Sequence, residues 1–303
     1  MVARSMIRGR ADAPRPQTGL ALPGRVLELR RWPVKSLAGE RIAASRLDGR
    51  GFAGDRTDAL FELRPDGTTL RRLTARQAPR MLLWSAAYAS LPDDGVRVEA
   101  PPSSTLTAPD GRTFSSDDPE IAVALSDDLG RRVEIRRDVG GQQDLPRSLL
   151  ITTEASRLAL EGLLGRGIDV RRFRPNVHVE LAGVEPFAEE RLTGARARIG
   201  EVELELLHPC QRCVIPTRHP DSTEKWPELL RFLARERALL FGLNVPGRSA
   251  RAAWPRETGS SFSPERGRGL TSAPGAGAPA PRAPCRAPPP SPPRRRGGDR
   301  RDR

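Results

Sequence analysis

Apolar and polar residues alternate over short stretches of the chain, at the two-residue period of half-buried β-strands. In residues 25–32, for example, Leu27 and Leu29 alternate with charged side chains, so one face of this segment would pack on a core. Turn signals, such as the Pro-Asp-Gly sequence at 65–67, separate such stretches. We therefore expect strands at 25–32, 59–63, 68–73, 94–100, 132–136, 148–152, 177–181, 196–199 and 202–207.

Three stretches instead follow the 3.6-residue period of amphipathic helices. The first has a capping residue at Asp118, proline at position 119 and an end near Leu129. The second runs from 153 to 165, with leucines on one side and a glycine at its end, and the third spans 222–241. Many short strands with three interspersed helices, and no βαβ repeat, predict a β-rich α+β fold that contains a β-barrel.

The net charge of +13 belongs mostly to the two ends of the chain. Residues 246–303 carry thirteen Arg against four acids, and residues 1–24 carry four Arg against one Asp. The body, 25–245, is nearly neutral, and the chain has few aromatic residues (4%) for base stacking, so we do not expect a nucleic-acid partner. The composition of both ends offers too little apolar surface to order them, which predicts disorder at 1–24 and 246–303.

Cysteine usage indicates a reducing compartment. Only Cys210, Cys213 and Cys285 occur, which is too few for a disulfide framework, so we expect a cytoplasmic location. No apolar stretch approaches the ~20 residues that a membrane span requires, and residues 1–24 lack the apolar segment of a secretory signal. A membrane partner is therefore not expected.

The sharpest chemical signal is the CxxC pair formed by Cys210 and Cys213, directly after the strand expected at 202–207. A structural zinc site would need two further ligands. His208 and His219 could supply them, although at an irregular spacing.

Two other interpretations of the pair remain open from the residues alone. A thioredoxin-type redox pair would begin a helix, which Pro216 opposes. Alternatively, both cysteines are unreactive and buried. The position of Arg212 between them argues for reactivity, because a nearby cation favours the thiolate, the form that binds soft metals.

Three more motifs could bind an anion, although each also fits a solvated surface loop. Residues 33–37 contain Lys35, one of only two lysines in the chain, and a compact ammonium suits a phosphate. In residues 51–56, glycines flank a turn that could fix the guanidinium of Arg56. Residues 171–176 combine arginines with an asparagine, which together can bind a phosphate and the amide edge of a heterocycle.

Together and in this order, these motifs resemble the MOSC family. The first half, with WPVKSLAGE, GRGFAGDR and LTARQAPR, is similar to the N-terminal β-barrel domain of that family. The second half, with LLITTEAS, RRFRPNVHVE and LHPCQRCVIPT, is similar to the MOSC domain itself. The resemblance covers about 25–245 and implies a barrel domain at 25–145 and a MOSC domain at 146–245.

The resemblance implies a molybdenum cofactor. The two-part form is similar to the mitochondrial amidoxime-reducing component and its bacterial relatives, in which molybdenum is held by a pterin dithiolene, oxo groups and one cysteine thiolate. The matching cysteine is Cys213, which would be both the metal ligand and the catalytic residue. By the same motif matching, the residues that would contact the molybdopterin or the metal's surroundings are Lys35, Ser36, Arg56, Arg174, Asn176 and Arg212.

The implied activity is two-electron reduction of small N-hydroxylated compounds. Electrons would come from a separate donor protein, such as a ferredoxin, a flavoprotein reductase or a cytochrome b5-like protein, because no ferredoxin-like cysteine cluster is present. The alternative is a non-catalytic carrier of the cofactor, or of sulfur as a persulfide of Cys213, related to molybdenum-cofactor sulfurase.

The C-terminus departs from the family. Members usually continue with a strand pair that ends in a G-x-I-x-V-G-D pattern, but here an Arg/Pro/Ala-rich segment follows Val245. We expect no strand after Pro246, an open sheet edge and lower stability. The residues of this segment suggest an out-of-frame or replaced C-terminus.

Overall fold

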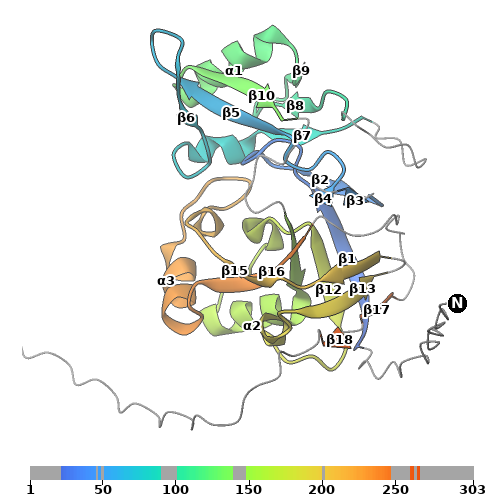
Figure 1. The fold of residues 1–303 in the computed structure, drawn as a ribbon. Coiled ribbons are helices and arrows are strands. Elements are labelled where there is room, and N and C mark those ends of the chain that lie inside the picture. Colours follow the sequence, from blue (N-terminus) through green and yellow to red (C-terminus); the bar gives the residue numbers. More distant parts are fainter. Residues whose placement is uncertain are drawn as a thin grey trace, which may run out of the picture. The chain divides into compact units, whose positions relative to one another are not determined.

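Figure 1 shows the fold in the computed structural model. The structure describes residues 22–45, 47–48, 51–89, 101–138, 148–199, 202–246, 260–262 and 265–266. The strand expected at 94–100, and most of the segments expected to be disordered, lie outside the described residues, so those expectations stay predictions. Within the described residues, the expected β-rich α+β fold is confirmed.

Residues 58–87 and 105–137 form most of a first half, built on two small antiparallel sheets. Their strand orders are β10 (Val133–Arg137), β5 (Asp58–Leu63), β6 (Thr69–Arg72) and β7 (Ser85–Ala87), β8 (Thr105–Thr107), β9 (Thr113–Ser115). Helix α1 (Pro119–Leu129) begins where the side chain of Asp118 accepts a hydrogen bond from the backbone of Glu120, and it ends at left-handed Gly130. Apolar side chains from both sheets and α1 share one core around Leu60, Leu106 and Leu125.

The second half is organised by a larger, seven-stranded sheet. Its order is β15 (His208–Gln211), β16 (Leu240–Pro246), β11 (Ser148–Thr153), β12 (Val177–Leu181), β1 (Leu22–Arg31) and β17 (Ser260–Phe262), with β2 (Glu40–Ile42) also on β1. A second sheet contains β14 (Val202–Glu205), β13 (Ala195–Ile199) and β18 (Glu265–Arg266), and a short hairpin contains β3 (Leu47–Asp48) and β4 (Gly51–Phe52). Strand β1 therefore belongs to the second half by pairing, and the chain then passes into the first half.

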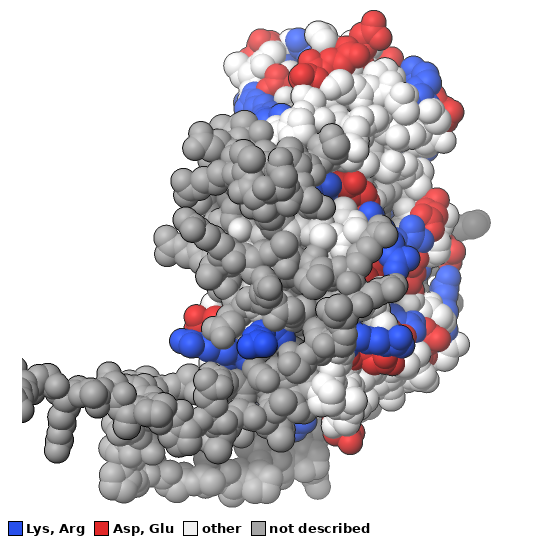
Figure 2. All heavy atoms as spheres, turned by 90° about the vertical axis from the view of Figure 1, so that its right-hand side faces the viewer, with Lys and Arg blue, Asp and Glu red and all other residues white. Residues whose placement is uncertain are grey.

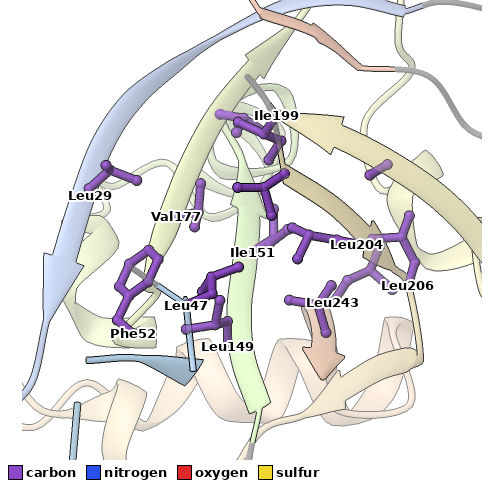
Figure 3. Close-up of a cluster of buried hydrophobic side chains, with 14 of the residues drawn as sticks. Leu29, Leu47, Phe52, Leu149, Ile151, Val177, Ile199, Leu204, Leu206 and Leu243 are labelled. Carbon is purple, nitrogen blue, oxygen red and sulfur yellow. The ribbon is translucent and has the colours of Figure 1, made fainter. Parts of the chain in front are cut away.

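Apolar side chains from these sheets fill a second core, shown in Figure 3. Ile151 and Val177 from the large sheet meet Ile199 and Leu204 from the smaller one. Phe52 of β4, only 1% exposed, is part of the same core. Packing of β4 on this core positions the glycine-flanked turn that follows it.

Helices α2 (Glu154–Leu164) and α3 (Pro227–Glu236) contribute to a third core, which includes Phe173 and Phe241. Helix α2 matches the expected 153–165, since Thr153 caps it and Gly165 ends it. The helix expected at 222–241 was wrong at both ends. The helix begins at Pro227, because proline has no backbone N–H and the first turn of a helix does not need that N–H for its hydrogen bonds. At the other end, the segment from Leu240 pairs with β11 as strand β16.

The prediction that no strand follows Pro246 was also wrong. β17 pairs with β1 through Leu22↔Phe262 to Gly24↔Ser260, and β18 pairs with β13. The pattern was missed because both strands are two or three residues long and carry no apolar alternation. These pairings partly cover the sheet edge that was expected to be open.

Charge is mixed over the visible described residues of one face of the molecule. On the face shown in Figure 2, acidic and basic side chains lie near one another rather than in patches of a single sign. In the described part of the chain, no helix is both long enough and apolar enough to cross a bilayer.

Candidate functional site

Arg56 joins the two halves of the molecule. It follows β4 in the GDR turn, is 7% exposed, and forms an ion pair with Asp55. Its Nη1 donates to Asn176 Oδ1 at 3.2 Å, and its Nη2 donates to the carbonyl oxygen of Arg174 at 3.3 Å. Asp55 also accepts a hydrogen bond from the backbone N–H of Trp32 at 2.8 Å. The structure thus brings together three predicted site residues from distant segments, with Asp55 orienting the guanidinium.

Asn176 is completely buried and is used mainly by the protein itself. Its Oδ1 accepts from Arg56 and from the backbone N–H of Leu150 (3.2 Å), and its Nδ2 donates to the carbonyl of Arg30 (3.2 Å). Its side chain therefore fastens β11, β1 and the GDR turn to one another. Within the described part of the chain, one of the two Nδ2 hydrogens of Asn176 has no hydrogen-bond acceptor. Asn176 is therefore better placed to position its neighbours than to bind a large ligand.

Trp32 supports this junction and was missed by the sequence reasoning. Its ring lies under the guanidinium of Arg174, with 4.1 Å from the guanidinium carbon to the ring centroid. Its Nε1 donates to the carbonyl of Pro175 at 3.0 Å, and the residue is 2% exposed. A signal was available: Trp32 is one of four tryptophans, and it opens the WPVKS motif.

Three of the predicted residues have backbone conformations that ordinary side chains avoid. The φ angles are 72° at Ser36, 51° at Arg56 and 56° at Arg174. Each costs roughly 1–3 kcal/mol, and such strain gathers at binding sites. Lys35, beside Ser36, is half-buried, and its backbone N–H donates to the carbonyl of Asp58 at 2.8 Å.

The sole tyrosine, Tyr88, supports the GDR turn from the first half. Its hydroxyl lies 2.9 Å from Thr57 Oγ1 and donates to the carbonyl of Gly54 at 3.2 Å. Burial raises the pKa of Tyr88 to about 12, so the hydroxyl stays protonated and can donate at physiological pH. The turn that carries Arg56 is therefore held from both sides.

The CxxC segment lies beside the Arg174 loop. Cys210 and Cys213 are half-buried free thiols. Arg212 Nη1 lies 3.0 Å from Cys210 Sγ, and its Nη2 donates to the carbonyl of Phe173 at 2.6 Å. Its Nε is buried without a hydrogen-bond partner. Arg212 thus ties the CxxC segment to Phe173. Its guanidinium contacts Cys210 and not Cys213, the expected metal ligand.

The zinc alternative gains no support. No group of three or more His, Cys, Asp or Glu side chains that could hold a metal occurs in the described ranges. The ring of His208 contacts the carbonyl of Pro209, and His219 Nδ1 accepts from the backbone N–H of Asp221. Cys213 is followed by the three-residue 3-10 helix η4 (Ile215–Thr217) and not by the α-helix of a redox pair.

Family comparison agrees with this architecture. The MOSC N-terminal beta barrel domain matches residues 23–131, and the MOSC domain matches residues 137–255. The chain belongs to the MOSC family.

Several curated proteins are similar over most of the chain. Mitochondrial amidoxime reducing component 2 is 26% identical in Macaca fascicularis and 27% in Homo sapiens, in each case over 73% of this chain and 74% of the relative. Molybdenum cofactor sulfurase from Drosophila grimshawi is 28% identical over 79% of this chain but only 33% of its own length. The chain is thus related both to the amidoxime reducing components and to one part of the sulfurases.

Proposed function

We propose that the chain holds a molybdenum–pterin cofactor at the junction of its halves, with Cys213 Sγ as the protein ligand to the metal, and reduces N-hydroxylated compounds. The observation that carries this proposal is the contact of Arg56 with Asn176 and Arg174, beside the CxxC segment. The MOSC family is associated with molybdenum-cofactor binding, and the relatives bear the names amidoxime reducing component and molybdenum cofactor sulfurase.

The donor set fits such a cofactor. The pterin carries a dianionic phosphate, and Lys35, Arg56 and Arg174 would place cations from both halves around the pterin and its phosphate, with Arg212 next to the metal. Molybdenum suits a soft thiolate, and Cys213 is a half-buried free thiol. The positive φ angles of Ser36, Arg56 and Arg174 agree with backbone held in place for binding.

The residues would divide the work. Asp55 and Asn176 keep the Arg56 guanidinium in one orientation, and Trp32 does the same for Arg174 through its ring. Lys35 and Ser36 would bind the phosphate end, while the Cys213 thiolate would hold the metal end. Arg212 fixes Cys210, which would keep the CxxC turn in shape without ligating the metal.

When bound, the cofactor would supply a two-electron centre that accepts the oxygen of the substrate. Reduction breaks the N–O bond of R–NHOH, consumes two electrons and two protons, and yields the amine and water. The chain has three cysteines, one fewer than an iron–sulfur cluster commonly uses, so a separate ferredoxin, flavoprotein reductase or cytochrome b5-like protein would deliver the electrons. The expected cytoplasmic location stays a prediction, since relatives are named mitochondrial.

The test is to measure metal content and reductase activity together. The full chain, made in a host that builds the pterin cofactor, should contain stoichiometric molybdenum and reduce an amidoxime or a hydroxylated nucleobase when a chemical reductant supplies the electrons. Cys213→Ser should abolish reduction, while the matched change Cys285→Ser should not. Undiminished activity in Cys213→Ser would refute the assignment.

A non-catalytic carrier is the second candidate, favoured by the match to part of the sulfurase. In that case the chain would hold cofactor, or a persulfide on Cys213, without reducing any N-hydroxylated compound. Bound molybdenum with no turnover across several such compounds, and with an active reductant, would favour the carrier over the enzyme.

A further inference from the structure

A small cavity beside the proposed cofactor site has a strongly cationic lining. Arginine side chains line it, no acidic side chain does, and its volume is about 40 Å³. A water takes up roughly 10–15 Å³ of such a cavity, so there is room for about three waters, or for one small oxyanion. The cationic lining residues are Arg30, Arg171, Arg172, Arg174 and Arg218.

This cavity is distinct from the predicted cofactor contacts. Apart from Arg174, none of the residues assigned to the pterin or the metal lines it. Its walls come from the end of β1, from the 3-10 helix η2 (Val170–Phe173) and from the segment around η4, with Gly39 and Leu82 on the first-half side.

Arg172 is a buried cation of the cavity wall, and its guanidinium lies 5.6 Å from the centre of the Trp226 ring. Arg172 is only 3% exposed, and its Nη1 donates to the carbonyl of Pro216 at 3.2 Å. Its Nε is buried and has no hydrogen-bond partner among the described residues. Burial is the largest cause that lowers the pKa of Arg172, the charge of Arg166 lowers it further, and the charges of Asp169 and Glu224 offset this only in part. A buried cation without a direct counter-charge is costly, so a bound anion would stabilise it.

The neighbouring carboxylates already form ion pairs with other arginines. Glu28 pairs with Arg30, and Asp169 and Asp221 both pair with Arg171. Arg218 donates to the carbonyl of Thr223 at 3.2 Å. Among the described residues, neither Arg172 nor Arg218 forms an ion pair, so two positive charges remain at the cavity without a close carboxylate.

We propose that this cavity binds a small tetrahedral oxyanion of the phosphate class, in addition to the cofactor. The two uncompensated cations match the charge of a phosphate dianion, and guanidinium groups donate to its oxygens in a favourable geometry. The anion is either free inorganic phosphate or the phosphomonoester end of a larger ligand. Because Arg174 borders both the cavity and the proposed cofactor contacts, the anion would lie next to the cofactor.

The test is isothermal titration of the full chain with inorganic phosphate and, separately, with methyl phosphate, at constant ionic strength against chloride. We expect saturable binding of phosphate to the cofactor-loaded chain, weakened by at least about tenfold, or 1.4 kcal/mol, in Arg172→Met and in Arg218→Gln. Arg235→Met removes an arginine whose side chain is 74% exposed and should leave binding unchanged. Comparable binding of methyl phosphate would identify the end of a larger ligand as the occupant, and binding of phosphate alone would identify the free anion.

Two results would overturn the proposal. One is a failure of the cavity to bind phosphate selectively, seen either as no saturable heat above the chloride background or as equal phosphate affinity in the parent chain and in a folded Arg218→Gln variant. The Arg218→Gln variant tests the cavity even if Arg172→Met fails to fold. The other is phosphate binding by the cofactor-free chain that disappears in the loaded chain, since the cavity would then hold the cofactor's own phosphate. Neither result depends on reductase activity, so failure of this proposal is separate from failure of the proposed function.

Discussion

The two ends of the proposed site are held to very different degrees. At the junction end, Arg56 and Asn176 are buried, and each makes several hydrogen bonds to other protein groups. At the metal end, Cys210 and Cys213 are half-buried, and the side chain of Arg212 contacts only Cys210. Under the proposed function, the difference would give a binding end that is formed before any ligand arrives and a metal end that is less tightly held.

The largest expected effect is a loss of stability when the junction end is changed. Asn176→Leu would leave the N–H of Leu150 and the carbonyl of Arg30 without their side-chain partner, and it would remove one contact of Arg56. Buried polar groups without partners cost about 1–3 kcal/mol each, so we expect a loss of about 2–4 kcal/mol in the free energy of unfolding. Urea denaturation of the purified chain measures it.

The other asparagine provides the control. Asn244 makes longer contacts, 3.3 Å to Ser148 and 3.4 Å to His208, so Asn244→Leu should cost less. Equal losses in the two variants would mean that the junction is no more rigid than the sheet around it.

A pH titration tests the support behind the GDR turn. With the pKa of Tyr88 at about 12 in the folded chain and near 10 in the unfolded chain, the unfolded state loses its proton first. The free energy of unfolding should therefore fall by about 2 kcal/mol between pH 10 and pH 12, and this part of the fall should be absent in Tyr88→Phe. Because Tyr88 is the only tyrosine, tyrosinate absorbance follows it directly. A midpoint near pH 10 in the folded protein would contradict the burial of this hydroxyl.

Trp32→Phe should have a smaller effect on stability and a specific effect on the site. It keeps an aromatic ring under Arg174 but removes the bond to the carbonyl of Pro175, at an expected cost of about 1–2 kcal/mol. Trp84→Phe is matched, since Trp84 Nε1 donates to Asp128 within the first half. Cofactor content, measured by pterin fluorescence after oxidation, should fall only in Trp32→Phe; an equal fall in both would show a general loss of folding.

Cys210→Ala should have the smallest effect. It removes one weak contact with Arg212 from a half-buried position in strand β15, so the cost should be no more than about 1 kcal/mol in thermal or urea unfolding. Molybdenum content should remain near that of the parent chain. Complete loss of molybdenum would make Cys210 a ligand and would mean that the metal end is also tightly organised.

The sequence predicted the elements whose signals are local. Helices α1 and α2 carry capping residues and terminal glycines, and most long strands alternate clearly. The extent of α3 and the existence of β17 depended on pairing with distant strands, which no local pattern records. The motif residues were identified through the family, whereas the role of Trp32 and the arginine-lined cavity arise only when 171–174 folds against the end of β1.

The central claim is that the Cys213 sulfur binds molybdenum held by the junction. Molybdenum-edge X-ray absorption on the cofactor-loaded full chain tests this most directly, with Cys213→Ser compared under identical conditions. We expect one fewer sulfur neighbour around the metal in the variant, with the sulfur atoms of the pterin dithiolene retained. An unchanged sulfur shell in Cys213→Ser would contradict the account.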